Sequence, residues 1–189
     1  MKKLSATLVS LHLGTQDDMS KQLCESVVAD LEGFVGDNHR GFSRVCYEGD
    51  TEPKGTVRRN NRQWSGMSEE ELFEIQEALG LTQPLTAEDL GVNICVRGID
   101  NFSRLPKGTK LVFPSGAALV VEDYNPPCTE MGDKIASLYT KNSGEPVTRK
   151  HFLIESKKKR GLVGAIDVPG EILSGDEITV KVYTPPNLD

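Results

Sequence analysis

The chain has 189 residues, of which 37% are apolar and 26% are charged; this composition is typical of one globular domain and excludes a largely disordered chain. Its 22 basic and 28 acidic residues give a net charge of −6, which argues against general nucleic-acid binding because such proteins carry an excess of Lys and Arg. No apolar run approaches the ~20 residues that a membrane helix needs, so no membrane span is expected.

Cysteine usage points to the cytoplasm. The four cysteines form no C-x-x-C pair, and the three histidines show no metal-ligand spacing with them. We therefore expect neither a zinc site nor a disulfide framework, and we expect the thiols to stay reduced in a cytoplasmic protein.

The first third of the chain predicts one clear strand and one long loop. Alternation of apolar residues over 4–13 predicts a strand, whereas residues 23–31 fit a helical face and a strand equally well. Residues 47–63 are polar and rich in Gly, Asp, Asn and Arg, and they indicate a long loop. Loops of this length in compact domains are often functional.

The middle of the chain predicts two helices. Ser68 and Glu71 form a capping box before an apolar stripe, and Gly80 follows as a stop signal, so a helix is expected between them. A shorter helix is expected over residues 86–90, closed by Gly91.

Strands and helices are both predicted in the second half. Apolar spacing predicts one helix between Cys128 and residue 139 and another over 148–158. The basic run 157–160 is interpreted as the solvated end of the latter helix, where cations complement the helix dipole before Gly161. Strands are predicted at residues 92–96, 110–113, 117–122, 162–166 and 177–183.

These elements predict a mainly β fold with helices, of the α+β class. Short strands entered by glycine turns, with few helices, are typical of a closed or partly closed β-barrel decorated by helices. Nothing marks an interdomain linker, so residues 1–189 are expected to form a single domain.

Cys128 is the first candidate for a chemical working group. The prolines at 126–127 fix φ and donate no backbone hydrogen bond, so the chain must leave the sheet there and hold the thiol at a rigid corner. Cys95 lies in an apolar strand and Cys24 in an apolar stretch, which favours buried, inert thiols, while Cys46 is undecided. For Cys128 itself, a reactive thiol and an inert one remain equally open.

A cluster of arginines is the second candidate site. Arg58, Arg59 and Arg62 share the polar loop with Asn and Gln side chains, and Arg40 and Arg44 lie upstream. Arg binds phosphate bidentately, so this cluster in an acidic chain indicates an anion site. A solvated loop neutralised by its own acidic residues explains the same pattern equally well. His39, just beyond Asp37, is a candidate general acid or base, with a hydrogen-bonding role as the alternative.

In this order, these pieces resemble the MOSC domain, found at the C-terminus of molybdenum-cofactor sulfurases and as small stand-alone bacterial proteins. The resemblance runs from about residue 27 to the C-terminus, with a single cysteine, Cys128, at the expected place. The matching stretches are residues 33–39, 62–65, 85–94, 105–113, 115–117, 127–128, 160–164 and 169–176.

The resemblance implies a MOSC-type β-barrel and a role for Cys128. In the family this thiol is proposed either to carry sulfur as a persulfide or to coordinate molybdenum held by a pyranopterin, and a thiolate suits both roles. It further implies that the arginine loop binds the phosphate of the molybdenum cofactor, with the neighbouring site formed by Asp37, His39, Asn93 and Asn125.

The chain departs from the family pattern at three places. Asn125 and Pro126 stand where many members carry a basic residue, and residues 47–61 read as an insertion. Full sulfurases also carry a pyridoxal-phosphate-dependent domain that extracts sulfur from cysteine; this chain has neither the length nor the lysine context for one, so pyridoxal phosphate is not expected to bind.

Three functions remain open at this level. The leading hypothesis is a molybdenum-cofactor or sulfur-handling protein centred on Cys128, with a cysteine desulfurase or a molybdoenzyme as partner. The second is a small molybdenum-dependent reductase of N-hydroxylated compounds. The third is a binding module that kept the fold without the chemistry. Whether the chain is an enzyme, sulfurtransferase-like or an oxidoreductase, is left open by the residues.

Overall fold

The computed structural model describes residues 2–15 and 19–187. Within this part of the chain, seven strands close into a barrel and an eighth, β2 (Gln22–Cys24), extends it beside β1. Closure comes from β1, which pairs with β13 on one side and with β8 on the other. Around the barrel the order is β1 (Lys3–Leu13), β13 (Glu177–Lys181), β9 (Lys110–Val112), β10 (Ala118–Tyr124), β11 (Leu162–Val168), β7 (Trp64–Ser68) and β8 (Ile94–Arg97).

The pairings are antiparallel except for that between β7 and β8, which is parallel. A parallel pair needs a crossover connection, and the helix α1 (Glu69–Leu79) supplies part of it. A small sheet of β12 (Gly170–Leu173), β3 (Ser26–Asp30) and β4 (Gly33–Phe34) lies beside the barrel. The mainly β barrel with helices predicted from the sequence is confirmed.

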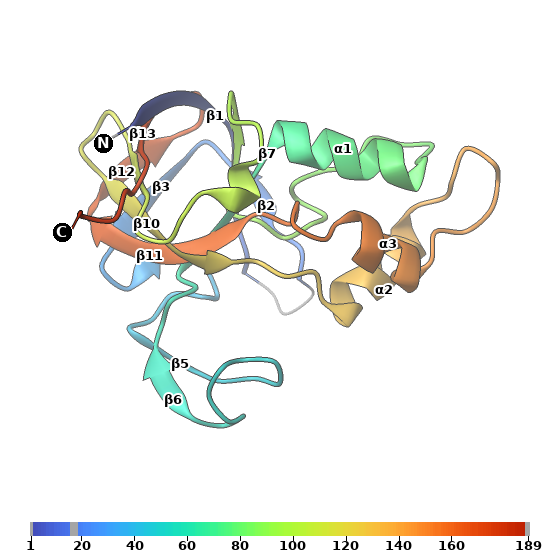
Figure 1. Cartoon of the computed structure of the whole chain (residues 1–189), viewed down its shortest axis with the longest axis horizontal. Coiled ribbons are helices and arrows are strands. Elements are labelled where there is room, and N and C mark those ends of the chain that lie inside the picture. Colours follow the sequence, from blue (N-terminus) through green and yellow to red (C-terminus); the bar gives the residue numbers. More distant parts are fainter. Residues whose placement is uncertain (1, 16–18, 188–189) are drawn as a thin grey trace.

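The helices gather at one side of the barrel (Figure 1). There α2 (Thr129–Leu138) packs against α3 (Arg149–Glu155), and α1 contacts α3. A single 3₁₀ turn, η1 (Phe102–Arg104), connects β8 and β9. None of the helices in the described part of the chain is long and apolar enough to cross a membrane.

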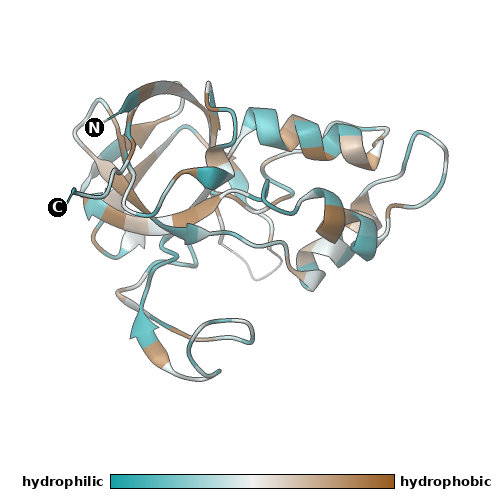
Figure 2. Ribbon diagram, viewed as in Figure 1, coloured by the Kyte–Doolittle hydropathy of each residue, from teal (hydrophilic) through white to brown (hydrophobic). Residues whose placement is uncertain are grey.

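The molecule has two hydrophobic cores, one inside the barrel and one beneath the helices. Strands β7 and β8 contribute side chains to both. Trp64 and Ile94 point into the barrel, whereas Met67 and Cys95 point into the core beneath the helices. This alternation follows from the two-residue period of a strand, which sends successive side chains to opposite faces. Trp64 is fully buried, and its indole Nε1 donates to the carbonyl of Ala165 at 3.1 Å. Figure 2 shows hydrophobic residues both in the strands of the barrel and in the helices.

The capped helix is confirmed, but its capping box is half formed. The Ser68 hydroxyl accepts from the backbone N–H of Glu71, and Gly80 ends the helix with φ of 62°. The Glu71 carboxylate does not return to Ser68; it accepts from the backbone N–H and the hydroxyl of Ser103, at 2.9 and 2.7 Å. The helix start is thereby joined to η1 across the buried layer.

Several element predictions need correction. Residues 86–90 form a hydrogen-bonded turn rather than a helix, and 23–31 resolves into strands β2 and β3. The predicted loop 47–63 contains β6 (Val57–Arg59), which pairs with β5 (Ser43–Val45) as a hairpin. This hairpin projects from the barrel (Figure 1). Its short strands carry no long apolar alternation, so only their mutual pairing defines them.

Candidate functional site

Cys128 stands where the chain leaves the barrel. Strand β10 ends at Tyr124, and the N–H of Asn125 still bonds the carbonyl of Gly161 at 3.0 Å. The two prolines that follow carry no N–H, and Cys128 then becomes the N-cap of α2. Its Sγ accepts from the backbone N–H of Met131 at 3.4 Å, and the residue is exposed. The predicted rigid corner is thus present, and it places an accessible sulfur at the N-terminal end of a helix, which is the positive end of the helix dipole.

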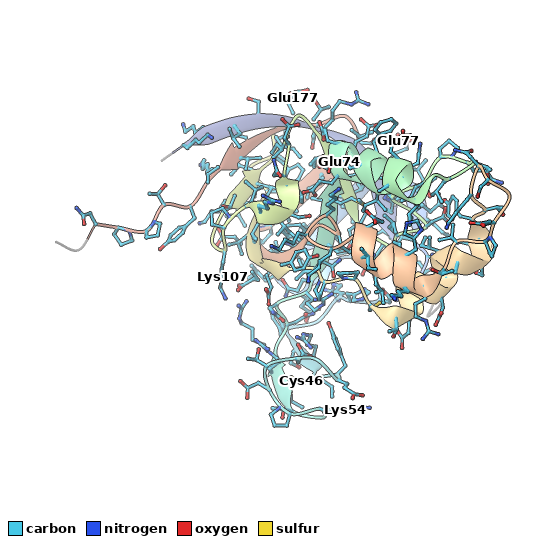
Figure 3. All side chains as sticks on the ribbon, turned by 45° about the vertical axis from the view of Figure 1, so that its right-hand side comes forward. Cys46, Lys54, Glu74, Glu77, Lys107 and Glu177 are labelled. Carbon is cyan, nitrogen blue, oxygen red and sulfur yellow. The ribbon has the colours of Figure 1, made fainter. Side chains whose placement is uncertain are left out.

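The other three cysteines are less accessible. Cys95 is buried, as predicted, and burial raises the pKa of its thiol to about 12. Cys46 is also buried although its loop projects from the molecule (Figure 3). Cys24 is half-buried; burial raises the pKa of its thiol, and Sγ lies 3.6 Å from the carbonyl of Leu11. Cys128 is therefore the exposed thiol among the four.

A cleft of about 1070 Å³ opens beside Cys128. One wall is the projecting hairpin, where Lys54 lies (Figure 3), and the opposite wall is the segment that leads into α2. Of the residues predicted for the site, the cleft brings together Cys128, His39, Arg58, Arg62, Asn93 and Asn125. Asp37 and Arg59 are not among the residues that line it.

Asp37 lies behind the cleft wall and organises it. The fully buried carboxylate accepts from Lys21 Nζ at 2.6 Å, Asn93 Nδ2 at 2.7 Å and the N–H of Gly14 at 2.9 Å. Its other oxygen accepts from the N–H of His39 at 2.9 Å and lies 3.2 Å from His39 Nδ1. Burial alone would raise the pKa of Asp37, but the hydrogen bond from His39 and the Lys21 charge outweigh burial and hold the pKa well below its usual range.

The side chain of Asn93 is likewise held by hydrogen bonds within the protein. Its Nδ2 also donates to the carbonyl of His12 at 3.1 Å, and its Oδ1 accepts from the N–H and hydroxyl of Ser65 at 3.0 and 3.2 Å. Asp37 and Asn93 thus fix the positions of Lys21 and His39, which reach the cleft.

The arginines predicted as an anion site divide into three environments. Arg44 is bound bidentately to Asp50, at 2.5 and 2.7 Å, so the neutralised-loop alternative holds for this residue. Arg59 points to Glu122 at 2.5 Å, outside the cleft. Arg58 and Arg62 line the cleft, and no ion pair to either occurs among the described residues.

Arg62 is held against the Cys128 segment by neutral contacts. Its Nη2 donates to Asn125 Oδ1 at 2.8 Å, and its guanidinium lies 5.7 Å from the ring centre of Tyr47. Arg44 lies 5.0 Å from the same ring. Both separations fall within the range of cation–π attraction. Arg62 therefore keeps its full charge available to a ligand in the cleft.

Arg160 is a cleft residue that the sequence did not reveal. The prediction that the basic run 157–160 is solvated is wrong for Arg160, which is 5% exposed and lines the cleft. The chain turns inward at Gly161, where φ is 89° and a Cβ would overlap the carbonyl oxygen of Gly66. Glycine is thus required there, and the pair Arg-Gly after a basic run was the available signal.

Lys21 and Tyr47 also line the cleft without having been predicted. Lys21 is placed by a carboxylate 16 residues away, and Tyr47 lies between Arg44, three residues before it, and Arg62, on the other side of the hairpin. Among the described residues, no three His, Cys, Asp or Glu side chains converge on one point, so a metal ion here would depend on the single sulfur of Cys128 and on ligands from a cofactor.

The site therefore combines one accessible soft sulfur with a wall of cations. Such a set suits an anionic ligand that carries either sulfur or a sulfur-bound metal.

Comparison with known proteins agrees with this fold. The MOSC domain model matches residues 48–179, and the chain belongs to the MOSC domain family. YuaD of Bacillus subtilis, which carries a provisional name for metal-sulfur cluster biosynthesis, is 34% identical over 186 residues, covering 96% of this chain and 93% of YuaD.

Solved structures extend the likeness. The crystal structure of Bacillus subtilis YuaD superposes with a TM-score of 0.90 at 30% identity, over 97% of this chain and 99% of YuaD. YiiM from Geobacillus stearothermophilus superposes with a TM-score of 0.59 at 16% identity, over 93% of this chain and 74% of YiiM. The YiiM likeness shows the shared fold.

Proposed function

We propose that this protein binds the molybdenum cofactor in the cleft beside Cys128, and that Cys128 either carries sulfur as a persulfide or coordinates the molybdenum. The observation that carries the proposal is the position of Cys128: an exposed thiol at a helix N-cap, on the wall of a cleft of about 1070 Å³ that also holds Arg58, Arg62 and Arg160. Membership of a family associated with the molybdenum cofactor supports it.

The residues of the cleft fit this cofactor. A thiolate is a soft ligand that suits molybdenum bound by other sulfurs. The cofactor also carries a phosphate, and Arg58 and Arg62 line the cleft and form no close ion pair among the described residues, although Asp50 lies near enough to feel the Arg58 charge. When bound, the cofactor would supply a molybdenum centre for sulfur- or oxygen-atom transfer. The chain itself binds the anion, orients the thiol and fixes Lys21 and His39 through Asp37.

A reductase of N-hydroxylated compounds is the second candidate. The volume of the cleft favours it, because about 1070 Å³ lies just above the ~300–1,000 Å³ range of small-molecule sites and leaves room for a substrate beside a cofactor. His39 is the side chain that would then move a proton, since its ring lines the cleft and is oriented by Asp37.

The proposal also assigns partners and location. A sulfur carrier needs a donor, a need that a cysteine desulfurase fits, and an acceptor, a need that a molybdoenzyme fits. All four cysteines are free thiols, which supports a place in the reducing cytoplasm.

Titration of metal-free protein with the molybdenum cofactor tests the binding site. Arg62→Ala should weaken binding by about 2 kcal/mol, roughly thirtyfold, because a charge-assisted contact is removed. Arg59→Ala is the matched control, since Arg59 pairs with Glu122 outside the cleft and should leave affinity unchanged. Equal affinities for wild type and Arg62→Ala would remove Arg62 from the site.

A further inference from the structure

Arg160 carries an unsatisfied donor in the wall of the cleft. Its guanidinium is buried, its Nη2 donates to the carbonyl of Leu90, and its Nη1 is buried without a hydrogen-bond partner among the described residues. No ion pair to Arg160 occurs in that part of the chain. A buried cation without a counter-charge is costly, and a buried donor without an acceptor adds to the cost. Arg160 is therefore poised to receive an anion.

The neighbourhood of Arg160 contains the reactive sulfur. Burial lowers the pKa of Arg160 to about 10; a negative charge on the nearby Cys128 sulfur would oppose this shift, whereas the Arg62 charge adds to it. Arg160, Arg62 and Cys128 all line the same cleft. A small anion held by the two guanidinium groups would thus lie beside the nucleophilic sulfur.

Acidic side chains do not neutralise the positive charges of Arg160 and Arg62 in the buried part of the cleft. Glu48, Asp123 and Glu130 line it but are exposed, and Asp50 is already bound to Arg44. Exposed charges act weakly through water, whereas a buried guanidinium is screened much less. The buried end of the cleft, with Cys128 at its edge, remains cationic.

We propose that Cys128 takes its sulfur directly from a small sulfane-sulfur donor with an oxyanion head, of the thiosulfate and thiosulfonate class, and that Arg160 with Arg62 binds the sulfonate group. The inference rests on the persulfide role proposed above and names its substrate class. A neutral donor would leave the buried Arg160 cation without a counter-charge, whereas a three-oxygen sulfonate head supplies both a negative charge and an acceptor for Nη1.

The step balances without an added oxidant. The Cys128 thiolate attacks the outer, sulfane sulfur of thiosulfate, a new S–S bond forms, and the bond between the sulfane and sulfonate sulfurs breaks. The electron pair of the broken bond leaves on sulfite, a dianion that the guanidinium groups stabilise. The product on the protein is the Cys128 persulfide, and the total charge of −3 is the same on both sides, counting thiolate and thiosulfate against persulfide and sulfite.

Thiosulfate alone is the probe for the first experiment. Metal-free protein is mixed with thiosulfate, sulfite release is followed, and the Cys128 peptide is examined by mass spectrometry for one added sulfur. We expect sulfite and persulfide in equal amounts, none of either with Cys128→Ser, and a rate lower by about tenfold or more with Arg160→Gln. Arg59→Gln removes the same charge outside the cleft and should react as wild type does.

A parallel reaction with a cysteine desulfurase and free cysteine separates this inference from the proposed function. Persulfide from the desulfurase but not from thiosulfate overturns the inference and leaves the carrier role standing. Persulfide from neither donor, with no binding of the molybdenum cofactor, overturns both.

A second measurement stands even if Arg160→Gln is less stable. The alkylation rates of Cys128 with iodoacetate, an anion, and with iodoacetamide, its neutral counterpart, are compared on the folded protein. Because both reagents react with the same thiolate, the ratio of the iodoacetate rate to the iodoacetamide rate does not depend on the fraction of thiol that is ionised. It reports the electrostatic potential around the sulfur. We expect a ratio above that of a free thiol in wild type and in Arg59→Gln, and a drop of about fivefold or more in Arg160→Gln. An unchanged ratio would overturn the role of Arg160.

Discussion

Replacing Asp37 should destabilise the fold more than any other single charge removal at the cleft. The carboxylate is fully buried and bonds the Lys21 ammonium, which is 3% exposed, at 2.6 Å. Asp37→Ala leaves that ammonium buried without a counter-charge and leaves the donors of His39, Asn93 and Gly14 without their acceptor. Breaking a buried pair in this way costs about 3–5 kcal/mol, a large share of the ~5–15 kcal/mol that stabilises a typical domain.

Urea unfolding of wild type and variants measures this loss. The control is Asp30→Ala, because the pair between Asp30 and Arg40 is partly exposed at both ends and should contribute far less. Adding Lys21→Met to Asp37→Ala removes the orphaned charge, so the double variant should be more stable than Asp37→Ala alone. If Asp37→Ala lost no more stability than Asp30→Ala, the buried network would not support the cleft.

The hydrogen bonds and the ion pair of Asp37 also make the stability of the fold depend on pH in the acidic range. Because the pKa of Asp37 is lower in the folded chain than in the unfolded one, its contribution to stability is complete above the unfolded pKa of about 3.9 and is lost as pH falls below it. Asp37→Asn should flatten the decline of stability in that acidic range. A decline as steep as that of wild type would show that Asp37 does not cause it.

Three further measurements test other parts of the account. Burial lowers the pKa of His12 from 6.5 to about 4. The contribution of neutral His12 to the free energy of unfolding should therefore be complete above pH 6.5 and fall by on the order of 3 kcal/mol toward pH 4. His12→Gln should abolish this fall, and a fall that persists in the variant would contradict the assignment to His12. Short alkylation of native protein should label Cys128 first, while Cys46 and Cys95, both buried, label on unfolding; peptide mass spectrometry decides, and an unlabelled Cys128 would make it a structural residue. Protein given free cysteine without a desulfurase should gain no persulfide, and its appearance in metal-free protein would contradict the absence of a sulfur-extracting centre.

Sequence signals that act locally were the reliable ones. The helix between Ser68 and Gly80 depends on a cap and a stop that lie within its own turns, and the corner before Cys128 depends on two prolines. Both were predicted because their causes lie within a few residues of their effects.

Features that depend on contacts between residues far apart in the chain could not be predicted from the sequence. The β5–β6 pairing is a contact between two polar segments, and β12 is a four-residue strand defined by its pairing with β3. Arg160 looked like the end of a solvated basic run, and only the close approach of Gly161 to Gly66 turns it into the protein. The division of the arginines between Asp50, Glu122 and the cleft likewise depends on which acidic residues the fold brings near.

The central claim is that Cys128 holds sulfur or molybdenum, and elemental analysis tests it most directly. Wild type and Cys128→Ser are purified from a host that makes the molybdenum cofactor, and molybdenum and labile sulfur are measured per chain. We expect a stoichiometric amount of one or the other in wild type and its loss in Cys128→Ser, whose side chain keeps a cap acceptor for α2 without the soft sulfur. Equal contents in the two proteins, or neither element in wild type, would contradict the account.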